Sequence, residues 1–281
     1  MAPEKDGGSK TVHMMASITV AAFNSLIFEG PGQAVMVNAI SGGMSLSAAA
    51  RKFTSDASAE PAYFARVQLS SLIEAGIHRG AIKYTILPIV REWCQERFPD
   101  SRLIQVTAPT AAVVLGEAAV IGPLTRGLIC VTHKQASNLF SGMRLVARTE
   151  GIRGLYKGTE QIMARTIAFT LAQNMGMTFT DAAFDKVAPL RPGEKRPLTQ
   201  QCVSSAVGAS CGVTASMLNQ VAFVEGHNQP GVSSFKIMMQ TATTPSSWSR
   251  YRGAWAAKMA FKVPNIIVLM TLPAWLARQF G

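Results

Sequence analysis

Charged residues are scarce in this chain. Asp, Glu, Lys and Arg make up 15% of its 281 residues, against 48% hydrophobic residues, whereas about 25% is usual for soluble domains. A soluble helical domain would need more charged faces than the chain offers, so the composition favours a membrane protein. No apolar run is as clean as a single-pass anchor. Several helices with isolated polar residues turned inward are therefore expected.

Motifs of catalysis and metal binding are also missing. The four cysteines lack Cys-x-x-Cys spacing, and the four histidines are isolated from one another and from any carboxylate pair. Metal or catalytic use remains open for one histidine, with an ordinary satisfied or exposed histidine preferred. There is no nucleophile with a matching base and no glycine-rich nucleotide loop. We therefore expect no enzyme, no metal and no cofactor.

A net charge of +11 fits either nucleic-acid binding or a membrane protein facing a negative compartment or anionic lipid. Lys and Arg are scattered at expected helix ends, without a dense basic run or interleaved aromatics. This distribution favours the membrane and predicts no nucleic-acid partner. Residues 1–11 form a polar extension with neither the apolar core of a secretory signal nor the character of an Arg-rich transit peptide.

The apolar pattern predicts an all-α membrane protein with six transmembrane helices. Six windows of the required length, with isolated polar residues allowed, are 13–40, 62–94, 105–133, 158–185, 199–224 and 253–278. Three short amphipathic segments, 44–53, 136–149 and 232–241, are expected to lie along the membrane surface.

The chain also repeats itself. Tyr156-Lys157-Gly158 recurs as Tyr251-Arg252-Gly253, and each tripeptide follows an apolar stretch. The separations from Pro31 to Ala65, Pro123 to Gly158 and Gln220 to Gly253 are 34, 35 and 33 residues. Such regularity predicts one domain, 1–281, built from repeats at 12–98, 103–188 and 197–280.

This frame resembles the mitochondrial carrier family over nearly the whole chain. In that family each odd-numbered helix bends at Pro-x-Asp/Glu-x-x-Lys/Arg, a surface helix follows, and a Glu-Gly...Tyr-Lys-Gly segment opens the even-numbered helix. The second repeat matches best, with Pro123, Glu150-Gly151 and Tyr156-Lys157-Gly158. The resemblance implies six helices in three pseudo-threefold repeats. It also implies the mitochondrial inner membrane as location, with the outer membrane left open.

Two lipid sites follow from the tripeptides. A helix N-terminus beside a cation suits a phosphate, and an interfacial tyrosine suits the headgroup layer. The resemblance implies cardiolipin as a structural lipid at Tyr156, Lys157 and Gly158 and at Tyr251, Arg252 and Gly253. The alternative is that Lys157 and Arg252 only extend towards the interface.

The charges of the family's motif are lost here. In transporting relatives, three acids and three bases at the bends form a ring of ion pairs that breaks and re-forms. The corresponding positions are Gln33 and Met36, Thr125 and Leu128, and Ala222 and Glu225. We expect packing to hold this end of the bundle, because replacing both partners of a buried pair by apolar groups can be neutral or stabilising. Glu225 would need water or a cationic partner such as Arg126.

A substrate site, if there is one, would centre on Arg165. A charge in an apolar stretch is costly in lipid and is expected to face the interior. Lys258, Lys262 and Arg79 would add positive potential. The alternative is that Arg165 pairs with Glu117 or Asp181.

Three functions remain open. The favoured one is a carrier-like protein that no longer transports and serves as an accessory or scaffold subunit of a large inner-membrane complex, bound to anionic lipid. The second is a divergent exchanger of a small anionic metabolite. The third is an outer-membrane carrier-like protein in protein insertion or membrane dynamics.

Overall fold

The computed structural model describes residues 19–20, 23–78, 86–190, 194, 196–229, 231–245 and 248–280. Within these ranges every regular element is a helix and there is no strand. The all-α prediction is thus confirmed for the described part of the chain. The extension 1–11 and Arg79 lie outside it.

The described helices run in the following order along the chain. They are η1 (Ser25–Glu29), α2 (Gly30–Gly42), α3 (Leu46–Ala59), α4 (Pro61–Ile77), α5 (Leu87–Arg97), α6 (Arg102–Gly116), η3 (Glu117–Ile121), α7 (Gly122–Thr132), α8 (Leu139–Leu155), α9 (Thr159–Val187), α10 (Leu198–Asn228), α11 (Ser234–Thr243) and α12 (Trp248–Phe280). A short helix, α3, α8 or α11, therefore stands between two helices of the bundle in each repeat.

Each of these short helices begins with a side-chain cap. Ser45, Asn138 and Ser233 accept a hydrogen bond from the backbone N–H three residues further on. Such a cap satisfies one of the N–H groups that a helix start leaves unpaired. Asn138 and Ser141 form a reciprocal capping box. The three surface segments predicted from amphipathic patterning are thus helices with well-defined starts.

Pro31 and Pro123 each follow a single π-helical turn. A proline has no N–H to donate and its ring displaces the carbonyl of the preceding turn. The widened turns η1 and η3 accommodate this: the Gly30 N–H bonds to the Ser25 carbonyl and the Gly122 N–H to the Glu117 carbonyl. In the third repeat, α10 has no proline and is a single helix of 31 residues.

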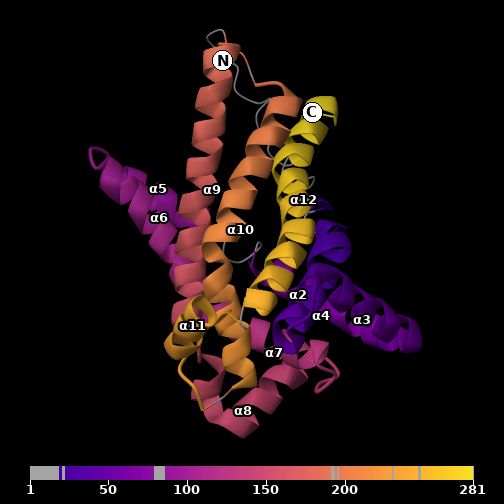
Figure 1. Ribbon diagram of the computed structural model, residues 1–281. Helices are drawn as coiled ribbons and strands as arrows, with labels where there is room; N and C mark the ends of the chain where they lie inside the picture. Colours follow the sequence, from indigo (N-terminus) through magenta and orange to yellow (C-terminus); the bar gives the residue numbers. More distant parts are fainter. Residues whose placement is uncertain are drawn as a thin grey trace.

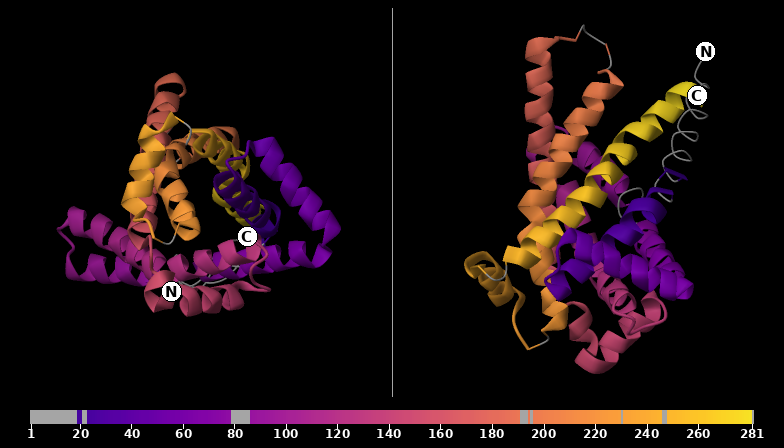
Figure 2. Two further views of the ribbon diagram at one scale, coloured as in Figure 1. Left: turned by 60° about the horizontal axis from the view of Figure 1, so that its bottom comes forward. Right: turned by 45° about the vertical axis from the view of Figure 1, so that its right-hand side comes forward.

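The bundle helices pack in chain order and close on themselves. α2 packs against α4, α4 against α7, η3 against α9, α9 against α10, α10 against α12, and α12 back against α2. Figure 1 shows α9, α10 and α12 as long neighbouring rods, with α8 and α11 near one end. Seen towards that end, the molecule has three sides (Figure 2). The hairpin of α5 and α6 projects away from the bundle.

Within the described residues, three helices are long and apolar enough to cross a membrane, at Thr107–Thr132, Leu198–Asn228 and Trp248–Leu272. They indicate a membrane-associated protein and correspond to three of the six predicted windows. The other windows are less simple. The window 62–94 holds α4 and α5 in its described residues, and residues 79–85 between them lie outside the described part of the chain. Six membrane crossings remain a prediction.

An apolar core joins the repeats. Its buried side chains come from α2, α3, α4, α7, α9, α10 and α12, and include Ile40, Val67, Ile129, Ile162, Val221, Val224 and Ala257. α2 contacts both α7 and α10. Apolar side chains of these three helices therefore pack together where the helices meet, beside the buried polar side chains Asn38, Arg126 and Glu225, and burial of apolar surface stabilises the arrangement.

A substitution at Gly253 can test whether α12 packs against the first repeat and so closes the ring of helices. A Cβ added there would lie 2.0 Å from the Met44 carbonyl oxygen, whereas one added at Gly76 would meet nothing within 4 Å. We expect Gly253→Ala to destabilise the protein by about 1–3 kcal/mol. Gly76→Ala, the matched control on α4, should be neutral or stabilising by about 0.5–1 kcal/mol. Thermal unfolding in mild detergent measures both, and an unchanged Gly253→Ala protein would contradict the described packing of α12 on this turn.

Candidate functional site

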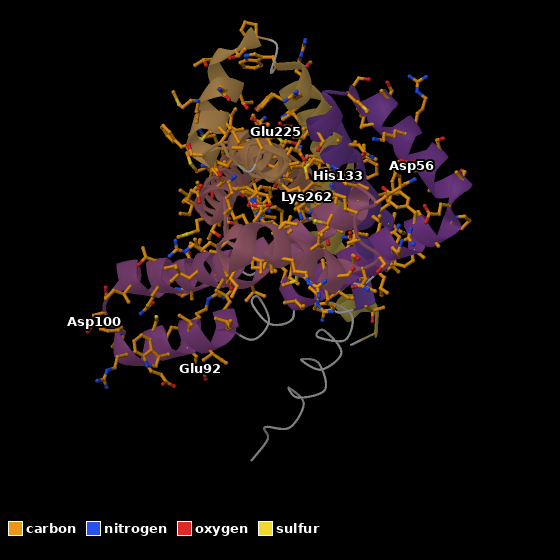
Figure 3. The ribbon with its side chains drawn as sticks, turned by 90° about the horizontal axis from the view of Figure 1, so that it is seen from below. Asp56, Glu92, Asp100, His133, Glu225 and Lys262 are labelled. Atoms are coloured by element: carbon orange, nitrogen blue, oxygen red, sulfur yellow. The ribbon has the colours of Figure 1, made fainter. Side chains whose placement is uncertain are left out.

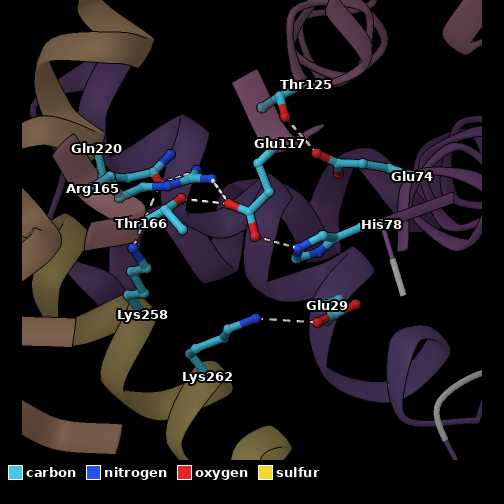
Figure 4. A network of polar contacts seen from close by, with 10 residues as sticks. All are labelled: Glu29, Glu74, His78, Glu117, Thr125, Arg165, Thr166, Gln220, Lys258 and Lys262. Atoms are coloured by element: carbon cyan, nitrogen blue, oxygen red, sulfur yellow. Dashed lines mark hydrogen bonds and ion pairs between the residues drawn. The ribbon is translucent and has the colours of Figure 1, made fainter. Parts of the chain in front are cut away.

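A cluster of charged and polar side chains lies inside the bundle (Figure 4). The helices that supply it come from all three repeats. Carboxylates come from η1, α4 and η3, and cations from α9 and α12. The cluster comprises Glu29, Glu74, His78, Glu117, Thr125, Arg165, Thr166, Gln220, Lys258 and Lys262.

Glu117 is the most connected carboxylate of this cluster. Its Oε1 lies 2.5 Å from His78 Nε2, and its Oε2 accepts a hydrogen bond from the Thr166 hydroxyl. Arg165 Nη2 lies 3.9 Å from the same Oε2. The Glu117 side chain is 6% exposed, and a buried carboxylate requires such partners because burial removes its hydration. Glu117 thus ties α4 and α9 to η3.

Two further links reach α12. Lys262 Nζ lies 3.2 Å from Glu29 Oε1, which joins the third repeat to the first. Gln220 Oε1 accepts from Arg165 Nη1 at 2.9 Å and from Lys258 Nζ at 3.5 Å. Gln220, which replaces the proline of the other repeats, thereby links α9, α10 and α12.

The predicted cations Arg165, Lys258 and Lys262 are therefore brought together. Arg165 contacts Glu117 and not Asp181, which lies 3.4 Å from Arg196 instead. Glu29, Glu74 and His78 were not predicted from the sequence as members of a site. Isolated ionisable residues in apolar windows were the signal that could have found them. The cluster as a whole offers both hydrogen-bond donors and acceptors, with the positive groups largely opposed by carboxylates.

Five of the six positions that would carry a gate hold uncharged side chains. Met36, Leu128 and Ala222 are buried, and Gln33 is half-buried. The Thr125 hydroxyl is buried and donates to the Glu74 carboxylate. No ring of cation–carboxylate pairs links these positions in the described structure.

Glu225 is the charged exception, and its partner differs from the expected one. Its Oε2 lies 3.1 Å from Arg250 Nη1 and accepts from Gln229 Nε2 at 3.1 Å. Arg126 instead lies 3.5 Å from Glu150, donates to the Lys157 carbonyl oxygen and stands over the Phe223 ring. The suggestion of Arg126 was wrong because α7 directs this guanidinium towards the α8–α9 connection of its own repeat.

Hydrogen bonds between neutral groups connect the three repeats at the C-terminal ends of α2, α7 and α10. The Ser41 hydroxyl, near the end of α2, lies 3.2 Å from His133 Nε2 and accepts from Asn228 Nδ2 at 2.9 Å. His133 directly follows α7, and Asn228 ends α10. One hydroxyl thus joins the C-terminal ends of α2, α7 and α10. Figure 3 shows His133 and Glu225 on the same side of the molecule.

The first predicted lipid site lies at the start of α9. Gly158 has φ of 81°, a left-handed conformation that favours glycine. Lys157 donates to the Gln229 carbonyl oxygen at 3.2 Å and lines a hollow of about 460 Å³ with Glu150, Arg153 and Gly154. Burial lowers the pKa of the Lys157 ammonium, and Arg126 lowers it further. Tyr156 is exposed, as an interfacial residue should be.

The second predicted lipid site has a different setting. α12 begins at Trp248, so Tyr251, Arg252 and Gly253 lie inside the helix and do not start it. Gly253 packs closely against the turn at Met44. The expectation that this tripeptide stands at a helix N-terminus was therefore wrong, because α12 already begins at Trp248. Lipid binding at either site remains a prediction.

Comparison with models of known protein families and with curated proteins finds no match for this chain.

Removing the Glu117 carboxylate should lower the free energy of unfolding, because the cations inside the bundle would lose a partner. Glu117→Ala leaves Arg165 and His78 without this carboxylate, and breaking a buried pair costs about 3–5 kcal/mol. The double variant Glu117→Met with Arg165→Met should recover most of that loss. Asp185→Asn, which removes the exposed partner of Arg196, is the control and should cost at most about 1 kcal/mol. Denaturant unfolding in detergent checks this, and equal effects of Glu117→Ala and Asp185→Asn would exclude a structural role for the cluster.

His133 should make stability depend on pH. Burial lowers the pKa of its imidazole, and the Lys52 ammonium lowers it further. The unfolded chain therefore takes up a proton near pH 6.5, before the folded protein does. Stability from this group is present above about pH 6.5 and is lost as the pH falls towards the lower folded pKa. Unfolding temperatures between about pH 7.5 and about pH 5 should fall less steeply in His133→Gln. Identical slopes would show that His133 contributes nothing.

Proposed function

We propose that this protein is a carrier-like membrane protein that does not transport and acts as an accessory or scaffold subunit of a large mitochondrial inner-membrane complex. Its family resemblance and its closed ring of helices support the carrier-like architecture. Anionic lipid, with cardiolipin as the expected species, would bind beside α9.

The observation that carries this proposal is the meeting point of α2, α7 and α10. A transporter must open and close this end, and switchable ion pairs provide two states of similar energy. Here buried Met36, Leu128 and Ala222 stand at three of those positions, and Ser41 adds neutral hydrogen bonds to His133 and Asn228. Opening would expose apolar surface at a cost of about 25 cal/mol per Å², without new ion pairs to offset it.

The interior cluster supports the same function. Arg165 is held by Glu117 and Gln220, and Lys262 by Glu29. An anionic solute would have to compete with these internal partners for its binding groups. The contacts of Glu29 with Lys262, of His78 with Glu117 and of Arg165 with Gln220 also join the three repeats, which is useful in a rigid scaffold.

The second candidate is an exchanger of a small anionic metabolite. The observation in its favour is that Arg165, Lys258 and Lys262 converge on one region of the interior (Figure 4). In this alternative, the cations would release their internal carboxylates and amide when the anion enters.

Reconstitution separates the two candidates. Purified protein in liposomes should exchange no tested anion, including phosphate, dicarboxylates and nucleotides, above the rate of empty liposomes. Glu225→Gln should keep its fold, because apolar packing dominates this end. Saturable uptake that disappears in Arg165→Ala would overturn the scaffold proposal and support the exchanger.

The scaffold role also predicts that the protein is part of a larger complex in its native membrane. Extracted from its native membrane in mild detergent, it should migrate in native electrophoresis well above its 30.0 kDa monomer mass. Migration of all of it as a lipid-bound monomer, together with the absence of transport, would leave neither candidate standing.

A further inference from the structure

The connection between α7 and α8 contains a backbone conformation that is rare for a lysine. Lys134 has a φ of 60°, and no other residue apart from glycine has a positive φ in the described part of the chain. This left-handed region crowds the Cβ of an L-residue against the following carbonyl oxygen and therefore favours glycine. A lysine in this conformation indicates that its side chain has a role there, because strained residues persist only where their surroundings hold them.

The first repeat makes the same turn with a glycine. The Gly43 N–H bonds to the carbonyl oxygen three residues before it, and the Met44 N–H to the one five residues before it. The N–H groups of Lys134 and Gln135 bond in the same pattern at the end of α7. Both are the left-handed turn that commonly ends a helix, and Gly43 has a φ of 61°. The backbone of the second repeat therefore gives no reason to prefer lysine to glycine.

The Lys134 side chain crosses from the second repeat to the first. Its Nζ lies 2.8 Å from Asp56 Oδ1 and 3.9 Å from Glu60 Oε2, where α3 ends and α4 begins. The same ammonium lies 4.9 Å from the centroid of the Tyr63 ring, within the range of a cation–π contact. Figure 3 shows Asp56 on the side of the molecule that also carries His133, the residue before Lys134.

Two other ion pairs near the short helices stay within one repeat. Arg126 pairs with Glu150 in the second repeat, and Arg250 pairs with Glu225 in the third. Lys134 differs from these cations because its carboxylate partners belong to another repeat. A change in the charge of Lys134 therefore acts on the contact between two repeats.

The same junction also has a contact that does not depend on charge. The Tyr63 hydroxyl is buried and donates to the Thr132 carbonyl oxygen at 3.1 Å, which joins α4 to α7. The side chains of Lys134, Asp56 and Glu60 are 40%, 28% and 42% exposed. Ion pairs with this exposure are weakened by salt. The junction thus combines a fixed contact at Tyr63 with a charge-dependent contact at Lys134.

We propose that Lys134 is a charge-dependent latch between the first two repeats. With its ammonium beside Asp56 and Glu60, the side chain compensates for the unfavourable backbone conformation and holds the α3–α4 turn against the α7–α8 connection. Without this charge the left-handed turn loses its compensation and the connection opens, while Tyr63 keeps α4 attached to α7. The latch uses none of the gate positions, and it operates in a scaffold and in an exchanger alike.

Hydrogen exchange followed by mass spectrometry tests the latch on the full-length protein in mild non-ionic detergent. The segments compared are 54–63, which contains Asp56 and Glu60, and 132–138, which contains the α7–α8 connection. Lys134→Gln removes the charge and keeps the strain, so exchange should become about tenfold faster in both segments. Lys134→Gly removes the charge and the strain together. Its exchange should become faster in 54–63 and stay near the native rate in 132–138.

Two further variants separate the charge from other properties of the side chain. Lys134→Arg keeps the charge and should exchange like the native protein. Lys236→Gln removes an exposed lysine from α11 and should leave both segments unchanged. Native exchange rates in Lys134→Gln would overturn the latch, as would rates in Lys134→Arg as fast as those of Lys134→Gln. Should Lys134→Gln fail to fold, Lys134→Gly takes its place, and a native rate in its segment 54–63 overturns the latch.

The salt response of the native protein gives a second measurement. Raising KCl from about 0.1 M to about 1 M shortens the screening length from about 10 Å to about 3 Å. Exchange in 54–63 and 132–138 should become severalfold faster in the native protein, whereas the charge-free variant should show no such response. Equal salt responses in the two proteins would show that Lys134 is not the charge that holds the junction.

Discussion

Hydrocarbon contact among α2, α7 and α10 is the constraint on which the rest of the structure depends. Buried side chains of all three helices belong to one apolar core, while Leu124 and Leu128 of α7 pack with Leu139 in a second cluster. Because dense apolar packing has a single well-packed arrangement, it favours one state of the bundle over two. The nearby polar groups follow this arrangement: Ser41 adds hydrogen bonds to His133 and Asn228, and Glu225 pairs with Arg250 of its own repeat.

The contacts within the interior cluster also follow from the scarcity of charged groups inside the bundle. Ionisable groups inside an apolar bundle must be paired or hydrogen-bonded, since burial removes their hydration. Glu117 and Gln220 meet this requirement for Arg165, and Glu29 meets it for Lys262. A scaffold gains rigidity from such contacts between repeats, whereas a transporter would have to break them in each cycle. The proposed loss of transport is therefore consistent at both levels of the bundle.

Much of the helix order could be predicted from local patterns. Pro31 and Pro123 indicated the bends, and the structure adds a π-helical turn before each one. The prediction that the second tripeptide starts a helix was wrong. Gly253 lies inside α12, where it allows a close approach to the Met44 carbonyl oxygen.

The sequence by itself determined the helical class, the spacing of the repeats and the absence of charge at most of the gate positions, because these depend on residue type and local backbone preference. Only the tertiary structure decided which groups meet. It assigned Arg250 to Glu225 and Glu117 to Arg165, and it placed the α5–α6 hairpin at the side of the bundle (Figure 1). The physical reason is that pairing depends on the relative rotation and tilt of helices distant in sequence, and these are set by the sum of many weak packing contacts.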